Sequence, residues 1–204
     1  MKPAKVKTST PDLILTAAER VVLRDGVMRL TLEAVAREAK LSKGGLLYHF
    51  ATKEALIQAM LARLIHYCER EIEVHRQHDV EPGRWTRAYV RRKLEPVLPY
   101  PGEADFPRSK EMGAGLIVAA TTTPGLLDPL RERFQAWQQA IEQDGIGVAR
   151  ATVVRLAVDG LWLAELLGIW SPSEQLRMQV LHELIHLTKE TRQARKKAPP
   201  GAIS

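Results

Sequence analysis

The stretch that decides the fold is TLEAVAREAKLSKGGLLYHFATKEAL, residues Thr31–Leu56. Apolar residues recur at helical spacing on both sides of Lys40, which predicts two short helices joined by a tight turn. Val35 belongs to the buried side of the first helix, and the small side chains of Ala36 and Ala39 let the second helix cross it closely. This arrangement is typical of a helix-turn-helix, which places its second helix in the major groove of DNA.

The start of the second helix has the chemistry of a phosphate-binding surface. Ser42 supplies a hydroxyl group and Lys43 a positive charge. Gly44 and Gly45 carry no Cβ, so another backbone can approach them closely. The free N–H groups at a helix start also favour phosphate.

The rest of the chain is predicted to be helical as well, because no convincing alternating strand pattern appears. The fold class is therefore all-α. The expected helices span Pro11–Asp25 with Thr10 as N-cap, Thr31–Ala39, Lys43–His49, Lys53–His78, Arg84–Leu94, Ser109–Thr121, Leu126–Glu142, Gly147–Leu167 and Ser173–Thr191. Thr31, Ser42 and Thr52 are candidate N-caps, and Gly26 is expected to end the first helix in the left-handed conformation.

Four segments are expected along the chain. Residues 1–9 form a disordered arm, and residues 10–54 form the helix-turn-helix domain. Residues 55–191 form a ligand-binding and dimerisation domain, and residues 192–204 form a basic flexible tail. The 204 residues carry a net charge of +6, and residues 1–54 hold 10 Lys/Arg against 6 Asp/Glu. This concentration of positive charge near the N-terminus favours a nucleic-acid partner.

The segment Asp12–Met60 resembles the TetR family of bacterial repressors. The resemblance rests on the string SKGGLLYHF (Ser42–Phe50) followed by TKEAL (Thr52–Leu56). The chain departs from the family pattern at Lys40, where glycine is common in the turn, and at Leu47, which holds a usual aromatic position. A left-handed residue other than glycine costs about 1 kcal/mol.

The resemblance implies double-stranded operator DNA as a partner. The DNA-contact candidates carried over are Thr31, Ser42, Lys43, Gly44, Gly45, Tyr48, His49 and Lys53. An alternative stays open for Thr31 and Ser42, which could serve only as helix caps.

The family also has a helical effector domain, and its last two long helices pair with a second subunit. Val153–Leu167 is apolar on nearly all sides, which favours burial. Leu176, Val180, Leu184 and Leu187 share one face of the last helix, broadened by Leu181 and Ile185. A symmetric homodimer would bury both helices, whereas the alternative is an ordinary core within one chain.

A small apolar or aromatic effector, with a cation as one option, is expected to release such a repressor from a palindromic operator. Aromatic and methionine side chains suit a ligand of this kind. The candidate lining residues are Trp85, Tyr89, Met112, Trp137, Asp159, Trp162, Glu165 and Trp170. Asp159 could hold a cation, but Arg155 stands one turn earlier, so an ordinary ion pair is favoured.

The sequence disfavours two other function classes. His182–His186 matches HExxH, a pattern of zinc metalloproteases, yet a third metal ligand is missing and Lys189 and Arg192 replace the Gly and His of the extended motif. We therefore predict that the chain is not an enzyme and binds no metal or cofactor. A DNA-binding module without an effector is disfavoured by the large C-terminal half.

The single cysteine, Cys68, excludes an intrachain disulfide and fits a reducing compartment. No signal peptide or apolar stretch of about 20 residues is found, so a cytoplasmic protein that does not enter the membrane is expected.

Overall fold

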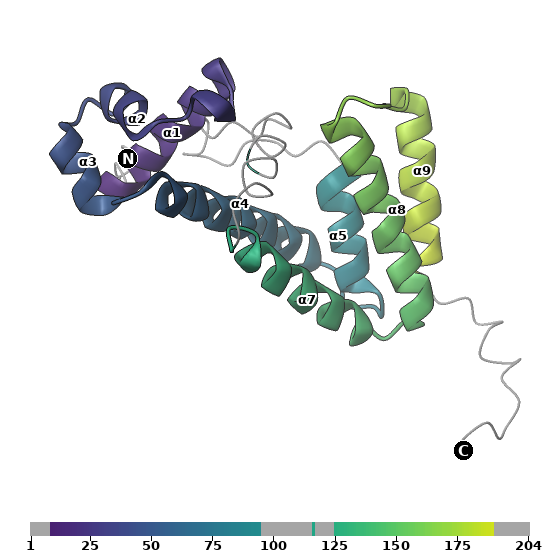
Figure 1. Cartoon of the computed structure of the whole chain (residues 1–204). Helices are drawn as coiled ribbons and strands as arrows, with labels where there is room; N and C mark the ends of the chain where they lie inside the picture. The colour runs from purple at the N-terminus through teal and green to yellow at the C-terminus, as the bar shows by residue number, and fades with distance from the viewer. Residues whose placement is uncertain (1–8, 95–115, 117–124, 190–204) are drawn as a thin grey trace, which may run out of the picture. The chain divides into compact units, whose positions relative to one another are not determined.

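The computed structural model of the chain describes residues 9–94, residue 116 and residues 125–189. Within those ranges all regular structure is helical (Figure 1). The elements are α1 (Thr10–Asp25), the 3₁₀ turn η1 (Val27–Arg29), α2 (Leu32–Glu38), α3 (Lys43–His49), α4 (Lys53–Arg76), α5 (Arg84–Leu94), α7 (Asp128–Glu142), α8 (Val148–Leu166) and α9 (Glu174–Leu187). The helix expected at 109–121 and the candidate Met112 lie outside the described residues, apart from Leu116.

The chain divides into two compact units, residues 1–67 with 98–133, and residues 68–97 with 134–204. The boundary falls inside α4 and inside α7. No helix of the described ranges is long and apolar enough to cross a membrane.

The first unit is built around α1, which packs against α2 (Figure 1). Ile14, Ala18 and Val21 of α1 are fully buried together with Val35 of α2 and Leu46 of α3. These residues recur at helical spacing along α1, which is why a helix of this sequence buries one side. The predicted helix-turn-helix is present, with α2 and α3 as its two helices.

Helix starts in the first unit are fixed by hydroxyl side chains. The hydroxyl of Thr31 accepts a hydrogen bond from Ala34 N at 3.1 Å, and that of Ser42 accepts one from Gly45 N at 3.0 Å. Thr52 caps α4 through Ala55 N at 3.1 Å. The cap expected at Thr10 is wrong by one residue. Ser9 holds that position, because its side chain accepts from Asp12 N, and Thr10 already lies inside the helix.

The turn after α1 and the turn between α2 and α3 have different backbone conformations. Lys40 has φ of 57° and is left-handed, so the α2–α3 turn keeps the conformation usually given to glycine. Gly26 ends α1 with φ of 80° and ψ of 158°. Its conformation is therefore an extended one that only glycine adopts readily, and not the left-handed helical one that was expected.

A buried carboxyl group joins α1 to α4 in the first unit. Glu19 is 1% exposed, and its Oε1 lies 3.4 Å from Nε of Arg63, while its Oε2 has no hydrogen-bond partner. Arg63 also donates to the carbonyl of Asp12 and to the hydroxyl of Thr16. Burial raises the pKa of Glu19 to about 7, although the positive charge of Arg63 opposes the shift.

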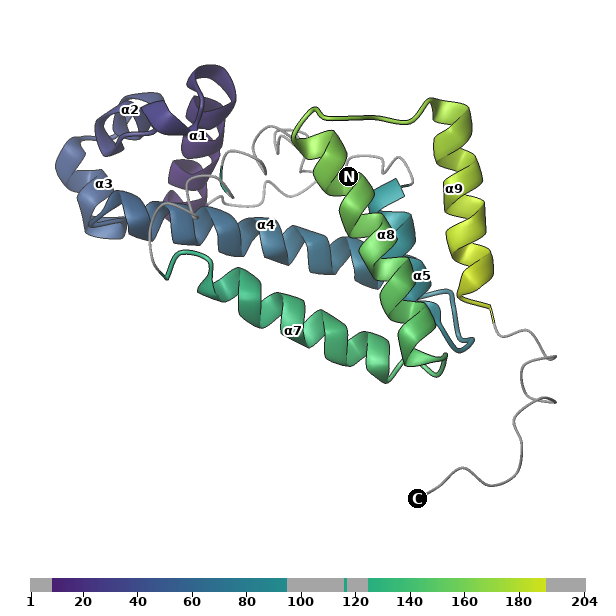
Figure 2. The same ribbon diagram turned by 45° about the vertical axis from the view of Figure 1, so that its right-hand side comes forward.

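The second unit contains α5, α8 and α9, which lie side by side (Figure 2). Its core joins Tyr89 and Val90 of α5, Val154 and Val158 of α8, and residues of α9. The face of α9 predicted from its leucines is divided, because Leu181 and Leu184 are buried in this core whereas Leu176 and Leu187 are 39% and 40% exposed. Part of the face therefore belongs to an intrachain core, and pairing with a second subunit stays a prediction.

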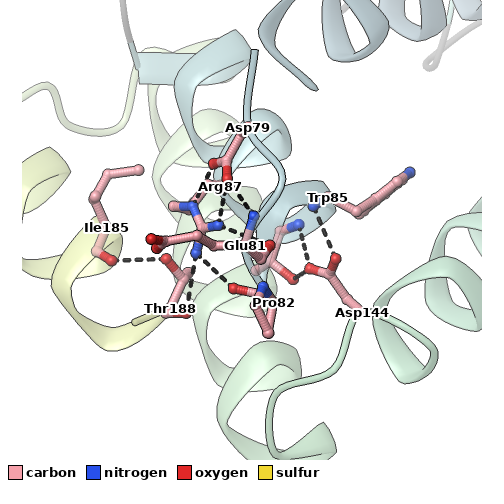
Figure 3. A network of polar contacts seen from close by, with 9 residues as sticks. Asp79, Glu81, Pro82, Trp85, Arg87, Asp144, Ile185 and Thr188 are labelled. Atoms are coloured by element: carbon pink, nitrogen blue, oxygen red, sulfur yellow. Dashed lines mark hydrogen bonds and ion pairs between the residues drawn. The ribbon is translucent and has the colours of Figure 1, made fainter. Parts of the chain in front are cut away.

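Arg87 ties the start of α5 to the end of α9 (Figure 3). It is 3% exposed and pairs with both carboxylate oxygens of Asp79, at 2.6 and 2.7 Å. It also donates to the carbonyls of Glu81, Pro82 and Thr188. The bonds from Arg87 hold the pKa of Asp79 below its usual range. One buried guanidinium thus satisfies groups from the α4–α5 turn and from the end of α9.

A second carboxylate closes the same junction. Asp144 accepts hydrogen bonds from the backbone N–H groups of Trp85 and Thr86 and from the Thr86 hydroxyl, and so caps α5 (Figure 3). Gly83 has φ of 87°, and a Cβ there would lie 2.5 Å from the Thr188 carbonyl oxygen. Only glycine fits at that point.

Candidate DNA-contacting surface and effector site

The exposed side of α3 brings most of the predicted DNA contacts together. Lys43 and Gly44 are exposed at its start, and Tyr48 is 85% exposed near its end. The rings of Tyr48 and His49 meet edge to face with centroids 5.0 Å apart. Because Tyr48 is so exposed, it contributes little to the packing of the chain's own core. Its ring surface is therefore available to an external partner.

Gly44 is not required by the packing of the chain. A Cβ at this position would meet no atom within 4 Å, whereas one at Gly45 would lie 3.2 Å from the hydroxyl of Ser42. A helical glycine costs about 1 kcal/mol relative to alanine. A partner that approaches the backbone of α3 closely would account for the glycine.

Thr31 and Ser42 act as helix caps. A capping hydroxyl accepts from the backbone, but its own hydrogen remains able to donate to a phosphate oxygen. Both residues are exposed, and Lys53 is half-buried at the start of α4. Capping therefore does not conflict with a second role for these two hydroxyl groups.

Glu33 is a residue of this surface that was not singled out from the sequence. Its carboxylate lies 2.6 Å from Nζ of Lys43, and both side chains are more than half exposed. The bond from Lys43 lowers the pKa of Glu33. The pattern that could have revealed it is the position of Glu33 in the first turn of α2, opposite the start of α3.

In the second unit, five buried or half-buried residues form a polar and aromatic group that we call the Lys93 cluster: Tyr89, Lys93, Arg155, Asp159 and Trp162. Nζ of Lys93 lies 2.9 Å from Oδ1 of Asp159, and it lies 4.2 Å from the ring centroid of Trp162. The hydroxyl of Tyr89 donates to the same carboxylate oxygen at 2.5 Å. Nε of Arg155 lies 3.4 Å from Oδ2, which is the ion pair favoured from the sequence.

Burial shifts the pKa of two members of this cluster, Lys93 and Tyr89. It lowers the pKa of Lys93, against the opposing effect of Asp159. Burial and the nearby Asp159 both raise the pKa of Tyr89, which stays a neutral hydrogen-bond donor. The carboxylate of Asp159 is thus already engaged by two cations and a hydroxyl of its own chain.

Three further aromatic rings extend the cluster. Trp85 stacks on Tyr89 with centroids 5.5 Å apart, and Trp137 meets Tyr89 edge to face at 5.8 Å. Phe134 packs on Trp137 at 5.2 Å and lies 4.9 Å from the guanidinium carbon of Arg155. The structure therefore brings together five of the predicted lining residues: Trp85, Tyr89, Trp137, Asp159 and Trp162.

Other predicted lining residues lie elsewhere or are not described. Trp170 is 53% exposed beyond the end of α8, and Glu165 forms an ion pair with Arg177 of α9. Lys93 was not predicted from the sequence to belong to this site. A lysine in the basic helix Arg84–Leu94 is expected to be exposed to solvent, whereas the side chain of Lys93 is 7% exposed.

The HExxH residues His182 and His186 are exposed on α9, beside exposed Gln175 and Gln179. Among the described residues no group of three or more His, Cys, Asp or Glu is arranged to hold a metal ion. The histidines therefore lie on the outward polar side of the helix.

One side of α8 is apolar and exposed. Val153, Leu156, Leu163 and Leu167 are between 46% and 64% exposed, and they repeat at spacings of three and four residues. Gly160 falls on the same stripe, and a Cβ there would meet nothing within 4 Å. We call these five positions the α8 stripe. A stripe with this spacing is the seam that helices use to pair.

Known relatives share both the sequence pattern and the fold. Residues 14–60 match the family described as "Bacterial regulatory proteins, tetR family", and residues 83–189 match "Tetracyclin repressor-like, C-terminal domain". The HTH-type transcriptional regulator RutR of Escherichia coli is 32% identical over 100 residues, or 49% of this chain and 47% of RutR. The chain thus matches about half the length of that relative.

A solved transcriptional regulator from Rhodococcus sp. Rha1 has a TM-score of 0.68 at 20% identity, covering 88% of this chain and 96% of that one. The multidrug binding protein EbrR complexed with ethidium has a TM-score of 0.59 at 25% identity, covering 86% and 98%. These relatives are transcriptional regulators and binding proteins rather than enzymes. The helix-turn-helix, the helical C-terminal unit and both family matches agree, and the chain belongs to the TetR family.

Proposed function

We propose that this chain is a homodimeric transcription regulator that represses by binding a palindromic operator and leaves it when a small aromatic effector binds. The observation that carries the DNA-binding part is the surface of α3. Exposed Lys43, Tyr48 and a glycine that the fold does not need stand together on the second helix of a helix-turn-helix.

The dimer supplies the geometry that a palindrome needs. Two recognition helices about 34–36 Å apart meet successive major grooves on one side of the duplex. The α8 stripe supports pairing with a second copy, because apolar surface of this kind gains free energy when it is removed from water.

Release by an effector follows from linkage. A small molecule that binds better to the state with the wrong helix spacing lowers the affinity of the protein for its operator. By the same factor, bound operator DNA lowers the affinity of the protein for the small molecule. Helix α4 runs without interruption from the first unit into the second, so it is the covalent route between α3 and the Lys93 cluster.

The DNA-binding part is tested by fluorescence anisotropy on a labelled palindrome taken from the DNA beside the gene. Lys43→Ala with Tyr48→Ala should weaken binding at least about tenfold at matched ionic strength. The lost lysine should also lower the salt slope by about one. Arg84→Ala, which removes an exposed cation of α5, is the control. Equal affinity of the double variant and the parent would rule the proposal out.

A further inference from the structure

The Lys93 cluster holds more positive than negative charge. Lys93 and Arg155 are both cations, and Asp159 is the one carboxylate that either of them contacts among the described residues. Their side chains are 7% and 9% exposed. The carboxylate of nearby Glu71 lies 3.3 Å from Nε of Arg92. Because Arg92 already offsets its negative charge, Glu71 does not balance the positive charge of the cluster. A buried excess of charge is costly unless another group neutralises it.

The donors of the two cations are incompletely used within the described part of the chain. Nε of Arg155 is buried and faces Oδ2 of Asp159 at 3.4 Å without making a hydrogen bond, and its Nη1 donates to Gln138 at 2.9 Å. Lys93 donates one hydrogen bond, to Asp159. An ammonium has three N–H donors and a guanidinium five, so an incoming anion would find donors from both residues.

The surroundings of these donors are aromatic rather than polar. Tyr89, Trp162 and Phe134 present ring faces to Lys93 or Arg155 at 4.2 to 5.5 Å, and Trp85 and Trp137 lie against Tyr89. Planar ligands pack well against such rings.

We infer that the effector is a planar aromatic anion whose carboxylate pairs with Lys93 and Arg155 while its ring lies against the surrounding aromatic side chains. This inference rests on the proposed function and specifies the chemical class of its effector. It departs from the cationic ligand considered for Asp159, because that carboxylate is neutralised by Lys93 and Arg155 before any ligand arrives.

Three probes with one ring system and different charges test it on the full-length protein without DNA: 2-naphthoate, 2-naphthamide and 2-naphthylmethylammonium. Calorimetric titration at fixed ionic strength should show naphthoate binding at least about tenfold more tightly than the amide, which is the effect expected of a charge-assisted hydrogen bond. The ammonium compound should bind most weakly. Equal binding of naphthoate and the amide, tightest binding of the ammonium, or no measurable binding of naphthoate would each overturn the inference.

Variants assign the charge effect to the two residues. Lys93→Met and Arg155→Gln should each weaken naphthoate binding about tenfold and leave the amide nearly unchanged. Lys93→Arg should keep the preference for naphthoate. Arg84→Gln, an exposed cation on the same helix as Lys93, is the matched control and should change neither. If either neutralising variant loses its helical circular dichroism, the comparison of the three probes on the parent protein still decides.

The failure of this inference can be separated from that of the proposed function. If naphthoate shows no preference while the operator is bound and another compound releases it, the anionic effector is wrong and the regulator stands. If naphthoate binds as expected and no palindrome is bound, the anion site stands and the regulatory function is wrong.

Discussion

Gly44 is the residue at which stability and the proposed function oppose each other. Gly44→Ala should raise the free energy of unfolding by about 0.5–1 kcal/mol, because alanine favours a helix and its Cβ meets no neighbour. The same methyl group should weaken operator binding by about tenfold, because the proposed DNA contact brings a phosphate backbone close to this position. Urea unfolding and anisotropy on one preparation measure both effects. A variant that is more stable and binds operator equally well would show that DNA does not come close at this point.

Glu19 should make stability depend on pH. In the unfolded chain this carboxyl ionises near its ordinary pKa of 4.5, and in the fold near 7. Between these values the folded state holds a proton that the unfolded state has lost, so stability falls as pH rises and is then level above about 7. The loss is at most about 3 kcal/mol, at 1.36 kcal/mol per pKa unit.

Glu19→Gln should remove this contribution. Urea unfolding of parent and variant at several pH values measures it, because the difference between their unfolding free energies should grow in favour of the variant from pH 4.5 to 7. A difference that stays constant with pH would mean that Glu19 keeps its ordinary pKa in the fold.

The sequence could predict residues whose role depends on near neighbours. Thr31, Ser42 and Thr52 were found as caps because a cap needs only a hydroxyl group and the next turn. The roles of Lys93 and Glu33 could not be found in this way, because each depends on a residue of another helix: Asp159 for Lys93, and Lys43 for Glu33.

At the level of elements, Arg87 should be a main support of the second unit. Arg87→Met should lower the free energy of unfolding by about 3–5 kcal/mol, because it leaves the Asp79 carboxylate and three carbonyls without their donor. Arg84→Met on the exposed side of the same helix should change it by less than about 0.5 kcal/mol. Urea unfolding followed by circular dichroism measures both. Similar losses for the two variants would show that the network adds little.

Helix positions were largely predictable, whereas the use of each face was not. Periodicity predicted α3, α5 and most of α8 within a residue or two, because it is a local property. It could not say which apolar face of α8 or α9 meets its own chain. Leu184 is buried in the core and Leu156 is exposed, although both are leucines on apolar helix faces.

For the whole molecule, the α8 stripe should control assembly. Leu156→Glu places a charge in the proposed seam and should raise the dimer dissociation constant at least about a hundredfold, equivalent to about 2.7 kcal/mol. Val80→Glu introduces the same charge at a residue that is 86% exposed in the α4–α5 turn, and should leave the dimer intact. Sedimentation velocity measures the assembly. A Leu156→Glu protein that remains dimeric would place the interface elsewhere.

The ion pair between Glu33 and Lys43 has a consequence for the search of a genome. In the proposed DNA-binding role of Lys43, a phosphate group would have to compete with the Glu33 carboxylate for this lysine. An exposed ion pair contributes little because water screens both charges, so this competition is small against the many contacts of a specific operator. Because attraction to non-specific DNA is mainly electrostatic, the proposed function implies that the pair weakens non-specific binding and shortens the time spent at each wrong site.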